Sequence, residues 1–218
     1  MARYRSSGQV ESYFDKHAEQ YDRQMGFVER HLLGANRGWA TEHACGRVLE
    51  LGVGTGLNLA LYPPQVTEVV GVELSRQMLS RAQARIDSGA LANRRVEHGD
   101  VEHLAAADGS FDTVVSTYTM CTIPDPAGAL REARRVLRPG GALVLVEHGP
   151  ASRRVVLAGQ RLVNPLSVRF QGDDMLRDAV VLAGAAGFDV LGCERVGWAG
   201  TVYRVLARAP RQDPASDR

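Results

Sequence analysis

Three glycines at alternate positions follow a short apolar run that contains an acid. The run is residues 47–51 with Glu50 inside it, and Gly52, Gly54 and Gly56 come directly after it. Glycine lets the backbone turn sharply and come close to a ligand. A glycine-rich turn between a strand and a helix predicts a ligand site at the carboxyl ends of the strands of a doubly wound sheet.

The spacing of these glycines discriminates between kinds of nucleotide site. A dinucleotide fingerprint needs glycine at position 57, where the chain has Leu57, and the G-x-x-x-x-G-K-S/T loop of triphosphate sites is absent. The Glu50 carboxylate would repel a phosphate and attract an ammonium group. Glu73 closes the next apolar run, 23 residues after Glu50, where an acid can accept hydrogen bonds from a ribose diol. These residues predict a site for a nucleoside without a pyrophosphate.

A third acid stands at the end of a third strand-like run. Asp100 follows Gly99 and precedes Val101. An acid followed by an apolar residue at this position can accept a hydrogen bond from an exocyclic amine and cover a purine ring. On its own, the Gly-Asp pair is equally typical of a plain turn.

Strand-like and helix-like segments alternate along the chain and would bring these acids to one edge of a sheet. Helix starts are expected at Ser75, at Asp125 before Pro126, and at Asp173 or Asp174. The alternation predicts an α/β fold with a Rossmann-like, doubly wound, mostly parallel seven-stranded sheet and an antiparallel edge strand. The expected strands are residues 47–51, 69–72, 95–98, 111–116, 142–146, 188–191 and 201–206.

The segments outside this alternation predict three further parts. Residues 1–45 read as an N-terminal helical cap, and residues 46–209 as the main domain. Within that domain, a lid insertion is expected near residues 150–172. Residues 210–218 are polar and contain proline, which predicts a disordered tail.

Composition excludes several classes of protein. The chain has 218 residues, 44% of them hydrophobic and 23% charged, which is typical of a soluble globular protein. Its formal net charge of +1 gives no reason to expect a nucleic-acid partner. No apolar run of about 18 residues exists, and the first residues lack an apolar signal segment, so neither membrane insertion nor secretion is expected. The cysteines, Cys45, Cys121 and Cys193, form no C-x-x-C pair, which predicts a cytoplasmic protein without a metal site.

Taken together, these segments resemble the class I S-adenosylmethionine-dependent methyltransferases, in the group that includes the ubiquinone- and menaquinone-biosynthesis enzymes. A further likeness, to small methyltransferases of thiols or phospholipid amines, rests on residues 59–64, 164–166 and 172–174, although Val53 stands where many of those proteins have cysteine. Five segments match the S-adenosylmethionine-dependent methyltransferases and keep their order across roughly half of the chain. They are residues 48–56, 71–75, 99–102, 111–115 and 136–141.

The resemblance implies that S-adenosylmethionine is the cofactor. It also implies which residues would bind each part of the cofactor. Glu50 and the glycine loop would hold the methionine part, and Tyr21 would cover it. Glu73 would hold the ribose, and Asp100 would accept from the adenine amine. The complete set of implied cofactor-binding residues is Tyr21, Glu50, Gly52, Gly54, Thr55, Gly56, Asn58, Glu73, Leu74, Met78, Asp100, Val101 and Thr117.

Two histidines are candidates for a general base. His148 follows the fifth strand at the carboxyl edge of the sheet, and its ordinary pKa near 6.5 suits proton transfer. His17 is the second candidate, because the N-terminal cap is expected to close over the site. The residues expected to line the acceptor pocket are Tyr118, Met120, Glu147, Arg161 and Arg169.

The leading hypothesis is methyl transfer by in-line displacement to an oxygen, nitrogen or sulfur nucleophile of a small-molecule acceptor. One alternative is a phospholipid or quinone methyltransferase at a membrane surface, which would need an exposed apolar or basic surface, expected in residues 10–39. Another is a cofactor-binding protein of the same fold that transfers no methyl group. An oxidoreductase is the remaining alternative.

Overall fold

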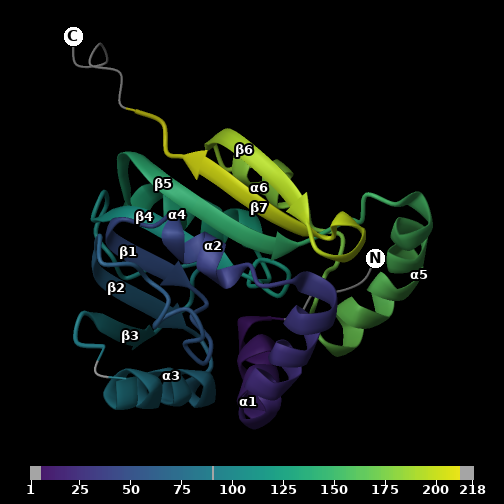
Figure 1. Cartoon of the computed structure of the whole chain (residues 1–218), viewed down its shortest axis with the longest axis horizontal. Helices are drawn as coiled ribbons and strands as arrows, with labels where there is room; N and C mark the ends of the chain where they lie inside the picture. The colour runs from purple at the N-terminus through teal and green to yellow at the C-terminus, as the bar shows by residue number, and fades with distance from the viewer. Residues whose placement is uncertain (1–5, 90, 212–218) are drawn as a thin grey trace.

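A seven-stranded sheet forms the centre of the computed structural model, which describes residues 6–89 and 91–211 (Figure 1). The strand order is β3-β2-β1-β4-β5-β7-β6. The first five strands of that order are parallel, and β7 runs antiparallel to both of its neighbours. This confirms the predicted fold class. The strands are β1 (Gly46–Leu51), β2 (Val66–Glu73), β3 (Arg94–His98), β4 (Phe111–Thr117), β5 (Leu137–His148), β6 (Asp189–Val196) and β7 (Val202–Arg208).

The central strands are apolar on both faces because helices cover both faces of the sheet. Along β1, Leu49 and Leu51 join a core that includes α4 (Pro126–Val136) and α6 (Ala179–Ala185). Val48, on the opposite face, packs in a second core with α2 (Arg37–Glu42) and α3 (Arg76–Gly89). A doubly covered parallel sheet therefore accounts for the unbroken apolar runs in the sequence.

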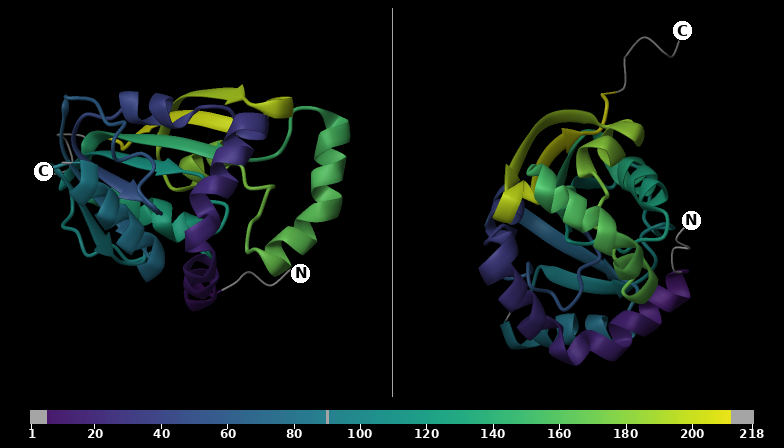
Figure 2. Two further views of the ribbon diagram at one scale, coloured as in Figure 1. Left: turned by 60° about the horizontal axis from the view of Figure 1, so that its bottom comes forward. Right: turned by 90° about the vertical axis from the view of Figure 1, so that its right-hand side faces the viewer.

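The N-terminal segment is helical, as expected, and lies past the carboxyl ends of β1 and β2. Helix α1 (Ser7–Val28) continues into a short π-helix, η1 (Glu29–Leu33), before α2 begins. The side chain of Asp15 on α1 accepts hydrogen bonds from Ser75 Oγ at 2.6 Å and Gln77 N at 3.1 Å, just beyond β2. Figure 2 shows α1 crossing that end of the molecule.

Helix starts follow the expected signals in two places and depart from them in a third. Ser75 Oγ accepts from Met78 N, and Asp125 accepts from Gly128 N at 2.9 Å. The last helix does not open at Asp173 or Asp174. It begins after Asp178, whose side chain accepts hydrogen bonds from the backbone nitrogens of residues 180 and 181. The two earlier acids lie in the preceding loop.

A long helix, α5 (Arg154–Phe170), fills the region expected to form a lid, and it stands out from the body of the molecule beside α1 (Figures 1 and 2). A turn of 3-10 helix, η2 (Trp198–Gly200), lies between β6 and β7. Among residues 6–89 and 91–211, no helix has the length and apolar character needed to cross a bilayer. Most of the expected C-terminal tail, residues 212–218, lies outside the described residues, as do residues 1–5.

The cap of α6 can be tested with Asp178→Ala. The substitution removes the acceptor for two free backbone N–H groups and is expected to lower the free energy of unfolding by about 1 kcal/mol. Urea denaturation followed by circular dichroism measures the change. Asp189→Ala, at an exposed strand acid, is the matched control and is expected to be neutral. Equal stabilities of the two variants would contradict the assigned start of α6.

Candidate functional site

The three glycines of the first loop serve different purposes. All have positive φ, +64° at Gly52, +57° at Gly54 and +83° at Gly56. A Cβ atom at Gly52 would overlap Thr119, and one at Gly56 would lie 2.7 Å from Leu59. A Cβ atom at Gly54 would meet nothing within 4 Å. Gly52 and Gly56 therefore let the loop pack closely against the protein, and Gly54 is the glycine that faces open space.

The carboxylate of Glu73 is fixed at the end of β2 by two backbone donors. Its oxygens accept hydrogen bonds from Gly54 N at 2.9 Å and Ser75 N at 2.8 Å. Burial raises the pKa of this carboxyl, and these backbone hydrogen bonds counteract the rise. Each carboxylate oxygen has two lone pairs, so each can accept one further hydrogen bond from a ligand.

A pocket with about 620 Å³ of empty space lies between these loops and α1. Eight of the thirteen residues expected to bind the cofactor line it. They are Tyr21, Gly52, Gly54, Glu73, Leu74, Met78, Asp100 and Val101.

Three of the other expected cofactor residues form a buried polar network behind the pocket wall. Glu50 accepts hydrogen bonds from Tyr62 Oη at 2.7 Å and Asn58 Nδ2 at 2.8 Å. Asn58 also reaches Thr117 Oγ1 at 3.0 Å, and Arg37 donates to both Asn58 and Thr117. Burial raises the pKa of Glu50 to about 7. The side chains of Glu50, Asn58 and Thr117 thus bond to one another and do not line this pocket, and their contact with the cofactor stays a prediction.

Thr55 and Gly56 are also absent from the pocket lining. Thr55 Oγ1 donates to Asp22 Oδ1 on α1 at 2.5 Å, and Arg85 on α3 donates to the other oxygen of Asp22 at 2.7 Å. These contacts fasten α1 across the glycine loop. Both residues therefore pack against the protein, and their predicted contact with the cofactor stays a prediction.

A second, larger cavity adjoins the first and has about 1320 Å³ of empty space. Its walls are mainly apolar and come from α1, η1, α5 and η2, including Met25, Leu32, Val156 and Trp198. The residues that line both cavities are Phe14, Tyr21, Tyr118 and Thr122. Tyr118 thus lies at the border between the two spaces, where an acceptor residue was expected.

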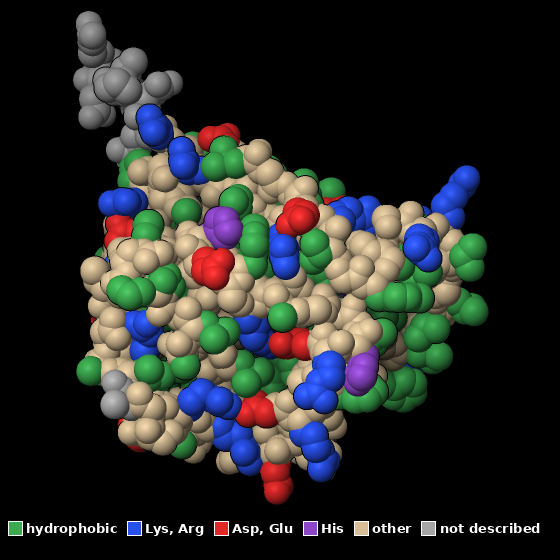
Figure 3. All heavy atoms as spheres, in the orientation of Figure 1, with side chains coloured by type: hydrophobic (Ala, Val, Ile, Leu, Met, Phe, Trp, Pro, Cys, Tyr) green, Lys and Arg blue, Asp and Glu red, His purple; other side chains and the backbone are tan. Residues whose placement is uncertain are grey.

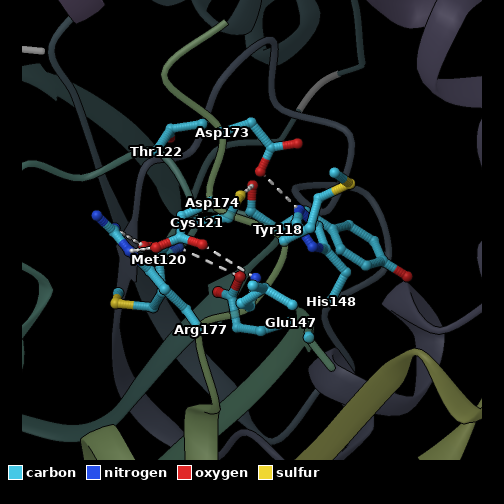
Figure 4. Close-up of polar contacts among 12 residues, drawn as sticks. Tyr118, Met120, Cys121, Thr122, Glu147, His148, Asp173, Asp174 and Arg177 are labelled. Atoms are coloured by element: carbon cyan, nitrogen blue, oxygen red, sulfur yellow. Dashed lines mark hydrogen bonds and ion pairs between the residues drawn. The ribbon is translucent and has the colours of Figure 1, made fainter. Parts of the chain in front are cut away.

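His148 lines the second cavity and is paired with an acid that the sequence did not single out as a functional residue. Its Nε2 lies 3.1 Å from Asp173 Oδ1, and Figure 4 shows the pair beside Tyr118. Burial lowers the pKa of His148, but the hydrogen bond and charge of Asp173 outweigh it, so the pKa is raised above 6.5. The thiol of Cys121 lies near the pair, and burial raises its pKa well above the ordinary value. These three side chains offer ligand atoms within 4.8 Å of one another.

Two loops hold this group of side chains in place. The loop after β4 is fixed by Glu147, which is buried and accepts from Ser116 Oγ at 2.7 Å and Thr119 N at 2.9 Å. The loop before α6 is joined to it, because Asp174 N donates to Cys121 O at 3.0 Å (Figure 4). This backbone contact places Asp173 opposite His148. The spacing of residues in the sequence did not reveal the contact.

Five other residues that were expected at the acceptor site or as the base line neither cavity, and their roles stay predictions. Met120 packs in the core and Glu147 is used by the loop after β4, so neither lines the cavity. Arg161 and Arg169 are exposed, because α5 turns a different face to the cavity. His17 does not line either cavity. Its Nδ1 lies 2.7 Å from the carbonyl oxygen of residue 13, one turn earlier in α1.

Comparisons with known proteins agree with this geometry. A family model described as a methyltransferase domain matches residues 49–145. Demethylmenaquinone methyltransferase of Roseiflexus castenholzii is 31% identical over 219 residues, 90% of this chain and 88% of that protein. Phosphatidylethanolamine N-methyltransferase of Cereibacter sphaeroides is 40% identical over 104 residues, 47% of this chain and 51% of that protein. Among solved structures, the cyclase SpnF superimposes with a TM-score of 0.75 at 18% identity, covering 95% of this chain and 98% of its own.

The chain belongs to the family of S-adenosylmethionine-dependent methyltransferases. This confirms the resemblance inferred from the motifs, and the cofactor of the family is S-adenosylmethionine. The chain spans 51%, 64% and 62% of the length of three curated relatives that it matches. The family match covers the loops after β1, β2, β3 and β4, whereas α1 and α5 lie outside it.

The role of Glu73 can be measured with Glu73→Ala and Glu73→Gln. Both variants remove the charge that strengthens hydrogen bonds to ribose hydroxyls, and each is expected to weaken binding of S-adenosylhomocysteine by about thirtyfold or more. Isothermal titration calorimetry gives the affinity, and circular dichroism shows whether each variant is folded. Glu97→Ala, at an exposed acid on β3, is the control. Unchanged affinity in folded Glu73→Gln would remove Glu73 from the cofactor site.

Proposed function

We propose that this chain transfers the methyl group of S-adenosylmethionine to an oxygen, nitrogen or sulfur atom of a small molecule with a largely apolar body. The observation that carries the proposal is the pair of adjoining cavities. One is lined by acids and glycines at the strand ends, and the other is apolar and contains the His148–Asp173 pair. They share walls, so a donor and an acceptor can meet at Tyr118.

The first cavity suits the cofactor chemically. Glu73 has lone pairs for two hydroxyl groups, and Asp100 offers a carboxylate at the strand end beyond it. Leu74, Met78 and Val101 supply apolar surface for a flat ring. When bound, the cofactor supplies a methyl group on a positively charged sulfur.

The protein's own contribution to such a transfer is alignment and exclusion of water. Phe14 and Tyr21 come from α1, and Tyr118 comes from the loop after β4, so the border between the cavities is aromatic on two sides. A dry, rigid border favours a reaction in which charge is spread in the transition state. Tyr118 is held rigidly, because its hydroxyl accepts a hydrogen bond from buried Asn36 at 3.3 Å and its backbone has a φ of +56°.

His148 is the proposed proton acceptor, and Asp173 is the residue that orients it. Nε2 lies 3.1 Å from the carboxylate of Asp173, so the tautomer that we propose has its hydrogen on Nε2 and its lone pair on Nδ1. Nδ1 is then free to accept a proton from a hydroxyl, amine or thiol. Asp173 also stabilises the imidazolium that forms, in the manner of the acid in hydrolase triads.

The pH dependence tests this assignment. His148 must be neutral to act as a base, so turnover is expected to fall as the pH drops through its raised pKa, above 6.5. Asp173→Asn removes the charge that raises this pKa, so the acid limb should shift to lower pH while the maximal rate falls about tenfold or more. The measurement is kcat against pH in EDTA, which removes any metal from the Cys121, His148 and Asp173 donor set.

Two variants complete that experiment. His148→Ala is expected to lower kcat about a hundredfold while leaving the affinity for S-adenosylhomocysteine unchanged. His17→Ala is the matched control, because His17 lines neither cavity. If His148→Ala turned over at the wild-type rate across the whole pH range, His148 would not be the base.

The activity itself is tested with radiolabelled S-adenosylmethionine and three sets of apolar acceptors that carry a hydroxyl, an amine or a thiol. Label is expected in at least one set, and Glu73→Ala should abolish it at low cofactor concentration. Tight binding of the cofactor without transfer to any acceptor would favour a non-methylating protein of this fold. That alternative is kept because a cyclase has the same fold.

A second candidate is a phospholipid or quinone methyltransferase at a membrane surface. It is supported by the apolar walls of the large cavity and by similarity to proteins named as phosphatidylethanolamine and demethylmenaquinone methyltransferases. The sequence interpretation expected the necessary exposed surface in residues 10–39, whereas most of the large exposed apolar side chains lie elsewhere, many of them on α5.

A further inference from the structure

We propose that α5 docks this protein onto an anionic lipid bilayer, with the mouth of the large cavity facing the membrane. The docking surface is the outer face of α5, defined here as Val155, Leu162, Val163, Leu166 and Phe170. The docking does not depend on methyl transfer. Only the idea that an acceptor enters the cavity from the bilayer rests on the proposed function.

The first observation is that α5 exposes a continuous apolar face. The side chains on its outer face are 85%, 80%, 50%, 58% and 61% exposed, from Val155 to Phe170 in order. The side chains that face the protein include two amides, Gln160 and Asn164. Helices on water-facing surfaces place apolar residues inward and polar residues outward. This arrangement therefore indicates that the outer face meets something other than water.

The inward amides fix this orientation. Gln160 donates to Gly149 O at 3.1 Å and accepts from Ala151 N at 2.7 Å. Asn164 donates to Asp174 Oδ1 at 2.8 Å and accepts from Met175 N at 2.8 Å. Rotating α5 to bury its leucines would break all four hydrogen bonds. The exposed apolar face is thus held in place by specific contacts.

The second observation is the charge around this face. Helix α5 contains Arg154, Arg161 and Arg169, with Arg153 directly before it, and no acidic residue. All four arginines are exposed. Figure 3 shows apolar side chains gathered over α5, with basic side chains at its upper end. Apolar side chains beside arginines are the pattern of helices that lie in the interface of anionic membranes.

The charge also selects among possible partners. A second copy of this chain packed symmetrically on the same face would bring these arginines together without an acid from either α5. Phosphate headgroups neutralise the arginines, and the acyl region accepts the leucines. A bilayer with anionic lipids therefore fits the surface better than a second copy does.

The third observation is that the docking surface continues into the cavity. Val156 and Gln160 on the adjoining face of α5 line the large cavity, as do Leu32 and Trp198. Leu32 and Trp198 are 47% and 56% exposed, although both are large and apolar. Tryptophan is favoured at the membrane–water interface, where one part of the ring is wet. The apolar surface thus runs from the outer face of α5 to the His148 side of the site.

Vesicle sedimentation of the full chain tests the proposal. We expect binding to phosphatidylcholine vesicles that contain phosphatidylglycerol, and at least tenfold weaker binding to phosphatidylcholine alone. A combined variant, Val155→Ser, Leu162→Ser and Leu166→Ser, should weaken binding about tenfold or more. Arg161→Gln and Arg169→Gln should each weaken it about fivefold at low salt, with little difference at high salt.

Val181→Ser and Leu191→Ser are matched controls, because these side chains are 65% and 59% exposed on α6 and β6. They should leave vesicle binding unchanged. Affinity for S-adenosylhomocysteine, measured on every variant, shows that the fold is intact and tests the cofactor site separately. Absence of binding to anionic vesicles, or equal binding by the triple variant, would overturn the proposal. So would a stable dimer in light scattering that the triple variant converts to monomer, because a second copy would then cover this face.

Discussion

Three carboxylates buried at the carboxyl ends of parallel strands are the constraint on which the site depends. Glu50, Glu73 and Glu147 end or nearly end β1, β2 and β5, and burial raises the pKa of each. A buried acid without partners is costly, so each one gathers hydrogen-bond donors from the loops around it. The donors are mostly neutral hydroxyl, amide and backbone groups. The loops that wall the cavities therefore take their shape from the acids, and only Glu73 also faces the pocket.

This explains which parts of the molecule could be predicted from the sequence. The succession of strands along the chain, the turn at the glycines and the position of Glu73 at a strand end follow from local patterns of apolar residues and glycine, and these were predicted. The hydrogen-bond partners of Glu50 and Glu147 were not predicted. The sequence around an acid at a strand end does not distinguish one that binds a ligand from one that binds a neighbouring loop. The His148–Asp173 pair was also missed, since the two lie 25 positions apart in the sequence, with the whole of α5 between them. The backbone bond between Asp174 and Cys121 and the hydrogen bonds of Arg177 to the carbonyls of Met120 and Ile123 join the two loops.

The two cavities also differ in where their walls come from. The cofactor side is formed mostly by loops within residues 49–145, the part that matches the family model. The walls of the larger cavity come mainly from α1, η1, α5 and η2, which lie outside that match. The match to the family model therefore covers most of the smaller cavity and little of the larger one. Under the proposed function, the choice of acceptor would depend on Phe14, Leu32, Val156 and their neighbours, whose pattern in the sequence is that of ordinary apolar residues.

Helix α1 has one more consequence for how the protein must work. It is fastened by Asp15 to the segment after β2 and by Asp22 to the glycine loop and α3. Its aromatic side chains, Phe14 and Tyr21, separate the two cavities and belong to both. Movement of α1 away from the sheet would open both cavities to solvent at the same time. Under the proposed function, a movement of α1 that released the nucleoside would therefore also open the acceptor cavity, so exchange of the two molecules by this route would be coupled.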